Sequence, residues 1–382
     1  MRSLQLIKTT RGATWALRQV KILRELGVDV HVVLPDDDGL APAYRAAGAH
    51  VHVLETDIAR LKMPSTFLRA RRAFRDLVAA VEPDVIHSHF VGTTLFMRAA
   101  MGRDGPVRIF QVPGPLHLEN PVTRAVDIVS ANARDRWIAS CRFTKDVYLK
   151  AGIDIRRVGL SYYGLDLDRF RVSHPVDLRA QHQLSPETKI IGMVAYVYAP
   201  KRILGQTRGL KGHEDLIDAV ALLIQQGRDL AVAFVGGPWN GAETYAAKLK
   251  EYAQRQLGNR AIFLGNRSDV ANLYAGFNVA VHPSHSENLG GAVESLCLAV
   301  PTVATDVGGF PDIVIPGQTG WLASPRSPID LARAIAHALD DPAFAKELAI
   351  QGASLVRHLL DVTRNAQEIA SYYETFTRKG TA

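Results

Sequence analysis

The chain has 382 residues, of which 47% are hydrophobic and 22% are charged. This length and balance are typical of a water-exposed globular protein with two ordinary domains, each able to bury its own core. The two cysteines, Cys141 and Cys297, lie far apart without a CxxC pair or clustered histidines, which argues against a disulfide framework and a zinc site. No secretory signal opens the chain, and no apolar run approaches the roughly 20 residues of a membrane-spanning helix.

The formal net charge of +7 is unevenly distributed. Residues 1–175 hold 26 Lys and Arg against 18 Asp and Glu, whereas residues 176–382 hold 19 against 20. The densest basic segment covers residues 60–80, and four of its five arginines stand among apolar residues at helical spacing. They are Arg69, Arg71, Arg72 and Arg75. Such a basic amphipathic helix suits contact with an anionic membrane, and an ordinary solvated basic face is the alternative.

Short apolar runs alternate with helical stretches along the first half of the chain. The predicted strands cover residues 4–8, 28–34, 50–54, 85–88, 107–112, 137–140 and 158–161. Between the first two lies a helical stretch at 14–25, and the later strands are separated in the same way. This alternation predicts a parallel sheet with helices on both faces.

The alternation stops over residues 164–188, a polar segment that contains Pro175 and Pro186 and that we interpret as an interdomain linker. It resumes with predicted strands at 189–197, 230–235, 261–264, 279–282, 302–305 and 320–323. The sequence therefore predicts an α/β fold of two Rossmann-like domains, 1–170 and 188–364, that face a central cleft. Ligands of such sheets bind beyond the carboxyl ends of the strands.

The most informative segment follows the strand predicted at 279–282. A polar turn leads to Gly290 and Gly291 and then to a helix that begins near Ala292. Glycines at a strand-to-helix turn allow backbone N–H groups to approach an anion, and the helix N-terminus adds partial positive charge. We therefore expect a phosphate or diphosphate site here, with Glu294 one helical turn further along.

This segment resembles the donor-site signature of the family 4 glycosyltransferases, retaining enzymes of the GT-B fold. The matching residues are Glu287, Gly290, Glu294, Val300 to Thr305, Gly308, Gly309, Ile313, Val314 and Gly317 to Gly320. One departure concerns the two glutamates, which are one residue closer together than is usual in the family. Ser286 therefore stands at the usual distance from Glu294.

Further segments extend the resemblance over nearly the whole chain. They are residues 83–89, 138–145, 163–170 and 210–213. The last helix, expected over 365–382, resembles the family's C-terminal helix that packs back on the first domain.

In the family, an arginine and a lysine of the second domain stabilise the departing diphosphate. Lys211 matches this lysine, and an ordinary exposed lysine at a helix start is the alternative. Tyr196 stands where the arginine is usual. The loop between them carries Lys201, Arg202 and Arg208, and we expect one of these to supply the second positive charge.

The resemblance also assigns roles to the turn and the helix after it. Glu294 would accept hydrogen bonds from the ribose hydroxyls of the donor, with a structural helix cap as the alternative. Glu287 would contact the donor sugar. The residues expected to hold sugar hydroxyls and phosphate are Ser286, Asn288, Leu289, Gly290 and Gly291.

The first domain is expected to bind the acceptor. Gly12 lies where the family has a glycine-containing loop after the first strand. His117 follows the fifth strand and stands near a family histidine that lies close to the sugar, with a plain loop histidine as the alternative. Of His87 and His89, at another strand end, we expect one to pack and the other to line the cleft.

No nucleophile stands out, in agreement with front-face attack in which the leaving phosphate helps to deprotonate the acceptor. No Asp-x-Asp pair lies where it could serve the predicted donor site, so we expect that the reaction requires no metal. We expect no cofactor beyond the nucleotide-diphosphate sugar, a UDP-sugar first and a GDP-sugar as the alternative. The expected acceptor is a glycan or lipid-linked glycan of bacterial cell-surface polysaccharide or lipopolysaccharide assembly, at the cytoplasmic face of the membrane.

Two alternatives remain open. The first is another enzyme on the same fold, such as a nucleotide-sugar epimerase, a hydrolase or a phosphorylase, because a fold does not fix a function. The second is a non-enzymatic basic module that binds lipid or nucleic acid. The basic half lacks aromatic interleaving and any recognition motif, so we expect no nucleic-acid partner.

Overall fold

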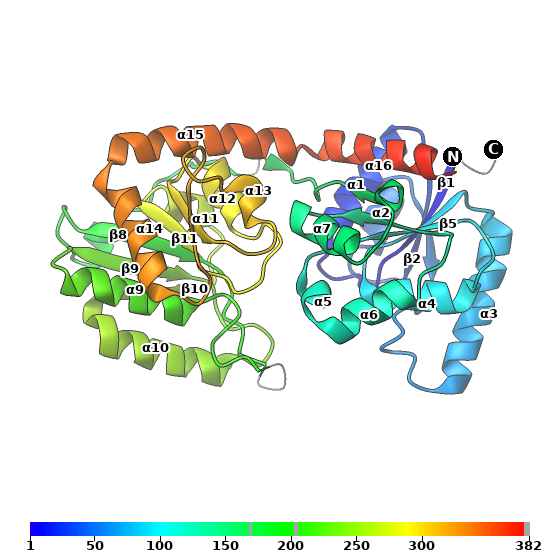
Figure 1. The fold of residues 1–382 in the computed structure, drawn as a ribbon, viewed down its shortest axis with the longest axis horizontal. Coiled ribbons are helices and arrows are strands. Elements are labelled where there is room, and N and C mark those ends of the chain that lie inside the picture. The colour runs from blue at the N-terminus through cyan, green and yellow to red at the C-terminus, as the bar shows by residue number, and fades with distance from the viewer. Residues whose placement is uncertain (168–169, 202–204, 378–382) are drawn as a thin grey trace. The chain divides into compact units, whose positions relative to one another are not determined.

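The computed structural model describes residues 1–167, 170–201 and 205–377, and it divides into two compact units. Unit 1 contains Met1–Asp166 and Leu359–Ala382, and unit 2 contains Leu167–His358. Each unit is a parallel sheet with helices on both of its faces (Figure 1). None of the described helices combines the length and the apolar character needed to cross a lipid bilayer.

Unit 1 is built on seven parallel strands in the order β3-β2-β1-β4-β5-β6-β7. They are β1 (Arg2–Leu6), β2 (Asp29–Leu34), β3 (His50–Val53), β4 (Val85–Ser88), β5 (Val107–Gln111), β6 (Asp135–Ala139) and β7 (Val158–Leu160). The central strands β1 and β4 are buried along almost their whole length. Helices cover both faces, and this explains why these strands appear in the sequence as continuous apolar runs.

Helices form a layer on each face of this sheet. One face packs against α1 (Thr14–Glu25) and α16 (Val362–Thr377), and the other against α3 (Pro64–Val81) and α4 (Val91–Met101). The shorter helices are α2 (Ala41–Ala46), α5 (Leu116–Glu119), α6 (Pro121–Val129) and α7 (Arg142–Lys150). The Tyr373 hydroxyl fixes α16 by hydrogen bonds to Gln5 at 2.7 Å and His87 at 2.6 Å.

Unit 2 contains six parallel strands in the order β10-β9-β8-β11-β12-β13. They are β8 (Lys189–Val194), β9 (Leu230–Val235), β10 (Ala261–Gly265), β11 (Val279–His282), β12 (Thr302–Thr305) and β13 (Trp321–Ala323). The helices are α8 (Leu178–Gln181), α9 (His213–Gln225), α10 (Glu243–Leu257), α11 (Val270–Tyr274), α12 (Ala292–Cys297), α13 (Phe310–Ile313), α14 (Pro328–Asp340) and α15 (Pro342–Leu359).

The predicted strands are all present, with ends that differ by a few residues. The strand predicted at 4–8 is Arg2–Leu6, and the strand predicted at 189–197 ends at Val194. The helix predicted at 14–25 is confirmed as α1. The last helix begins at Val362, earlier than expected, and residues 378–382 lie outside the described part of the chain.

The segment 164–188, predicted as a linker, belongs mostly to unit 2. The division between the units falls after Asp166, and α8 lies inside the segment. Leu178 of this helix is fully buried in a core cluster of unit 2. Val176 and Leu184 of the same segment pack against this cluster, but the polar residues and prolines between them hide the pattern in the sequence.

The strand order of unit 2 creates a switch point between β8 and β11. The chain proceeds from β8 to β9 and β10 on one side, and then crosses to β11, β12 and β13 on the other. The loops that follow β8 and β11 therefore diverge at the carboxyl edge of the sheet. A divergence of this kind leaves a crevice where ligands of doubly wound sheets bind.

Candidate active site

A cavity of about 310 Å³ opens at this carboxyl edge of unit 2. Its wall contains the last residues of β8 and β9, Val194 and Val235, together with Asn266 after β10 and Gly291 after β11. Two groups of opposite charge, Lys211 and Glu294, also line it. The structure thus brings together the lysine and the glutamate that the sequence singled out from separate segments.

Lys211 is positioned by the glycine that follows it. Gly212 has a φ of +72° at the N-terminal cap of α9, and a Cβ there would lie 1.9 Å from the carbonyl oxygen of Pro283. Only glycine suits both the left-handed backbone and this close approach. The Lys211 side chain is 19% exposed, pairs with the Glu287 carboxylate, and lies with its Nζ 5.8 Å from the centre of the Tyr198 ring.

The turn after β11 folds around Glu287. One carboxylate oxygen accepts a hydrogen bond from the backbone N–H of Asn288 at 3.1 Å, and the other pairs with Lys211. Gly290 has a φ of +44°, and a Cβ there would lie 2.7 Å from the Glu287 carboxyl carbon. Gly290 thus lets the turn close over the Glu287 carboxylate that pairs with Lys211. Ser286 and Leu289 of the same turn are buried.

Glu294 is the third residue of α12, directly after the turn. A Cβ at Gly291 would lie 3.1 Å from both the Val194 carbonyl oxygen and the His282 ring, so the turn packs closely on β8 and β11. His282 is buried, and its Nε2 lies 3.0 Å from the hydroxyl oxygen of Ser295. Burial, with a smaller effect of the Lys211 charge, lowers the pKa of His282 to about 3. His282 is therefore a neutral support beneath the turn.

Asn266 and Arg267 line the same cavity, although no motif in the sequence marks them as site residues. The Asn266 side-chain oxygen accepts a hydrogen bond from the backbone N–H of Gly237 at 2.7 Å. The Arg267 guanidinium is 38% exposed and pairs with Asp269 at 2.6 Å. Their position could have indicated a role in the site, because both residues directly follow a predicted parallel strand, at the sheet edge where the other site residues lie.

Arg208, one of the expected phosphate-binding cations, is held by carboxylates. It forms ion pairs with Asp215 at 2.5 Å and with Asp218 at 2.8 Å. Burial opposes the charged form, but hydrogen bonds to the two aspartates raise the pKa of Arg208 above its ordinary value. Arg208 lines a second cavity, of about 440 Å³, together with His285 and Arg326. Within the described part of the chain, the wall of the Lys211 cavity does not include Arg208.

The other cations expected in this loop are Lys201 and Arg202. Lys201 is exposed, and Arg202 lies outside the described residues. Tyr196, at the position where the family has arginine, lines the Lys211 cavity and is 45% exposed. Its ring lies 4.9 Å from that of Trp239, which is 6.1 Å from Tyr198, so three aromatic rings stand beside the cavity.

His117 and Gly12 lie in unit 1. His117 is in α5, where its Nε2 lies 3.4 Å from both the Asp127 carboxylate and the Tyr148 hydroxyl. Asp127 is buried and also pairs with Arg98, so His117 borders a buried charged network. Gly12 has a φ of +75° with open space where a Cβ would stand, so its left-handed backbone accounts for the glycine.

His87 and His89 at the end of β4 both have no exposed surface. His87 contacts the Tyr373 hydroxyl, and the Nε2 of His89 lies 2.8 Å from the Gln5 side-chain oxygen. Burial lowers the pKa of His89 to about 3 and holds the pKa of His87 well below its ordinary value. The expectation that one of them lines a cleft is therefore wrong, because α16 and α1 cover the strand end with Tyr373 and Trp15.

Comparison with known proteins assigns most of the chain to two matched regions. Residues 203–354 match the model of the glycosyl transferases group 1, and residues 12–169 match that of Glycosyltransferase Family 4. D-inositol 3-phosphate glycosyltransferase 2 from Catenulispora acidiphila is 31% identical over 287 residues, which are 72% of this chain and 60% of that protein. The capsular polysaccharide biosynthesis glycosyltransferase CapM from Staphylococcus aureus is 23% identical over 94% of this chain and 93% of its own length.

Among solved structures, HepE from Anabaena in complex with UDP is similar to this chain. Its TM-score is 0.77 at 21% identity, over 97% of this chain and 99% of the HepE chain. At this identity the likeness shows the fold, and it confirms the prediction of two Rossmann-like units of the GT-B type. With both family models matched in sequence order, the chain belongs to the group 1 glycosyltransferases of family 4.

Proposed function

We propose that the protein is a retaining glycosyltransferase that moves a sugar from a nucleotide-diphosphate sugar to a glycan or lipid-linked acceptor. The observation that carries this proposal is the presence of Lys211 and Glu294 on the wall of one cavity at the switch point of unit 2. A cation suits the phosphates, and a carboxylate suits the ribose hydroxyls. The cavity volume of about 310 Å³ lies at the lower end of the range for small-molecule sites.

Lys211 acts on the leaving group. As the bond from the sugar C1 to the phosphate oxygen breaks, negative charge gathers on the diphosphate, and a fixed cation stabilises this transition state. The acceptor oxygen forms its new bond to C1 on the face that the diphosphate leaves. Its proton passes to an oxygen of the leaving phosphate. Glu287, which pairs with Lys211, contacts the hydroxyls of the donor sugar.

Arg267 supplies the second positive charge at the diphosphate. It lines the cavity with Lys211, and its guanidinium is partly exposed there. Arg208 is the alternative from the sequence, but it lines the other cavity and pairs with two carboxylates, whereas Arg267 pairs with Asp269 alone. In this arrangement Arg267 compensates for the tyrosine that replaces the usual arginine at position 196.

The donor in this proposal is a UDP-sugar, with a GDP-sugar as the alternative. HepE, which shares the fold, was solved with UDP, and this supports uridine as the nucleoside. Unit 1 is assigned to the acceptor, with the Gly12 loop and His117 as its candidate contacts. CapM, whose name refers to capsular polysaccharide biosynthesis, supports an acceptor of that class.

A membrane contact through unit 1 fits a lipid-linked acceptor at the cytoplasmic face of the membrane. The helix predicted in the basic segment 60–80 is α3, and Arg69, Arg72 and Arg75 are exposed on it. Exposed arginines attract anionic lipid headgroups. Leu68 on the same helix is 58% exposed.

Helix α6 of the same unit has its apolar side outward. Val122, Val126 and Val129 are 70%, 44% and 82% exposed, whereas Asp127 is buried. On the inward side of α6, Asp127 forms an ion pair with Arg98 of α4. An outward apolar stripe is a feature of a helix that lies in a membrane interface.

The transferase proposal is tested by a thermal-shift panel of nucleoside diphosphates and nucleotide sugars, with and without EDTA. A ligand that binds the native state raises the melting temperature. We expect a shift with UDP and UDP-sugars that is lost in Lys211→Ala and Glu294→Gln. The matched controls are Lys248→Ala and Glu251→Gln, which replace exposed residues of α10. No shift with any nucleotide would contradict the proposal.

The remaining alternatives are separated by product analysis. A transferase joins the sugar to an added acceptor with retained anomeric configuration, which NMR of the product reports. An epimerase or hydrolase converts the nucleotide sugar without any acceptor. Membrane contact is tested by co-sedimentation with vesicles of neutral or anionic phospholipid. We expect binding only to anionic vesicles, weakened both by replacing Arg69, Arg71, Arg72 and Arg75 with Gln and by Val126→Asp, and not by Ile329→Asp on α14 of unit 2.

A further inference from the structure

Four side chains of metal-binding type meet at one edge of the unit 1 sheet. Asp29 and His31 alternate along β2, and His50 and His52 alternate along β3, so each pair projects from one face of its strand. The register places His31 opposite His50, which brings the two pairs onto the same face. Because β3 is the last strand of the sheet order, the group lies at the sheet margin.

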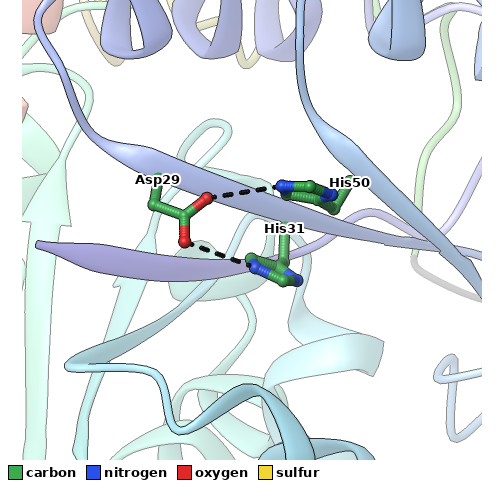
Figure 2. Close-up of side chains that lie close together, drawn as sticks. All are labelled: Asp29, His31 and His50. Atoms are coloured by element: carbon green, nitrogen blue, oxygen red, sulfur yellow. Dashed lines mark ion pairs between the residues drawn. The ribbon is translucent and has the colours of Figure 1, made fainter.

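The Asp29 carboxylate faces two imidazoles, as Figure 2 shows. The Nε2 of His31 is 3.6 Å from one carboxylate oxygen, and the Nε2 of His50 is 3.6 Å from the other. These distances are longer than a hydrogen bond of about 2.7–3.2 Å. Two ligand atoms of a tetrahedral metal with bonds of about 2.0–2.1 Å lie about 3.3 Å apart. Each 3.6 Å distance is close to this value, although the two distances go to different carboxylate oxygens. One ligand atom from each of the three residues lies within 4.8 Å of the others, so a small shift of the side chains would let them share one cation.

His52 orients the His31 ring through the ring nitrogen that does not face Asp29. Its Nε2 lies 2.9 Å from the Nδ1 of His31, with the two rings stacked at 5.2 Å. A proton on the Nδ1 of His31 in this hydrogen bond leaves the lone pair of its Nε2 directed toward Asp29. Metal-binding histidines almost always donate their second ring N–H to such a partner, which fixes the tautomer.

Two arginines hold Asp29 from its other side. The Nε of Arg2 lies 2.8 Å from one carboxylate oxygen, and a terminal nitrogen of Arg24 lies 3.3 Å from the other. A carboxylate has about four lone-pair positions, so it can accept from both arginines and still contact a cation. The guanidinium charges orient the carboxylate but weaken the attraction for a cation. An ion that binds imidazole strongly is therefore favoured over Mg²⁺ or Ca²⁺, which prefer oxygen ligands.

We propose that Asp29, His31 and His50 bind one divalent transition cation, with Zn²⁺ as the best fit, and that His52 acts as a positioning residue. The ion links the edge strand β3 to β2. His50 is 61% exposed, so the remaining coordination position is open to water. The site belongs to unit 1 and is independent of the nucleotide cavity of unit 2 and of the proposed transfer reaction.

The test uses the full chain, stripped of metal with a chelator that is then removed. Zn²⁺ is titrated by calorimetry, and Co²⁺ is followed by its visible absorption as a probe of coordination. We expect one site per chain in the wild type. His52→Ala weakens Zn²⁺ binding by about 10- to 100-fold, the usual effect of removing an orienting partner. His50→Ala weakens it further, because a ligand is lost.

His182→Ala is the matched control, because His182 is an exposed histidine of unit 2 and should not affect binding. Melting temperatures of the metal-free variants check folding, and the exposure of His50 allows its replacement without loss of the fold. Wild-type protein that binds no Zn²⁺ would overturn the proposal. So would binding that is unchanged in His50→Ala, or that falls equally in His182→Ala.

Discussion

The ion pair between Lys211 and Glu287 lies where the donor diphosphate is expected, so the two residues should respond differently to replacement. Lys211→Ala removes the phosphate cation, and we expect weaker UDP binding together with a loss of turnover of about 10²- to 10³-fold. Glu287→Gln releases Lys211 from its partner, so UDP affinity should be unchanged or higher while turnover falls. Calorimetry with UDP and initial rates measure the two effects. Weaker UDP binding in Glu287→Gln would show that Glu287 itself supports the nucleotide.

At the scale of single residues, replacing Arg267 and replacing Arg208 should have opposite effects on UDP binding and on stability. Arg267 lines the cavity and is partly exposed, so Arg267→Gln should weaken UDP binding with little change in stability. Arg208→Gln removes the guanidinium from the buried Asp215, which keeps His285 as a partner, and should lower the free energy of unfolding by about 1.5–2 kcal/mol. Urea denaturation and UDP titration of both variants distinguish them. Loss of UDP affinity in Arg208→Gln at unchanged stability would instead assign the phosphate role to Arg208.

His282 makes stability depend on pH in a defined direction. Its pKa is lowered by burial to about 3, so the unfolded chain takes up a proton near pH 6.5 while the folded one does not. Neutral His282 therefore makes its full contribution to the free energy of unfolding above about pH 6.5. This contribution is lost as the pH falls toward 3, by up to about 1.4 kcal/mol per pH unit. His282→Asn should reduce the slope of this dependence in urea denaturation between neutral and mildly acidic pH, while the buried His87 and His89 keep their share of it. The exposed His182→Asn should leave it as in the wild type.

At the scale of elements, α9 begins and ends next to glycines that differ in one respect. Gly212 and Gly227 both have a positive φ, but only at Gly212 would a Cβ meet a neighbouring backbone atom. Gly227→Ala should cost about 1 kcal/mol, from backbone strain alone. Gly212→Ala should cost more, about 3 kcal/mol, and should also displace Lys211 and weaken UDP binding. Chemical denaturation compares the two, and equal costs would show that the contact with Pro283 is unimportant.

At the scale of the whole molecule, the cavity is formed entirely by residues of unit 2. Hydrogen exchange followed by mass spectrometry, with and without UDP, should therefore show its largest protection in the loops that line it. These are residues 194–198, 266–270 and 287–294. The strands of unit 1 should exchange at the same rate in both conditions. Protection confined to unit 1 would contradict the assignment of the nucleotide to unit 2.

The fold and part of the site could be predicted from local patterns. Each buried strand is a short apolar run, so the sequence predicts the strands of both sheets with small differences at their ends. The Lys211 segment and the Glu287–Glu294 turn are recognisable because their glycines and charged residues follow one another in a fixed order. The cleft role expected for one of His87 and His89 was wrong, because residues far away in the sequence cover that strand end.

The sequence by itself determined the two α/β units, the family and the segments that supply Lys211 and Glu294. Only the tertiary structure decided which charges are paired. Arg208 is bound to Asp215 and Asp218, Arg267 reaches the cavity, and α6 turns its valines outward. The group at Asp29, His31 and His50 likewise depends on the register between two strands. Local sequence encodes periodicity and burial, whereas ion pairs and cation sites depend on the distance between side chains that only the packed chain brings together.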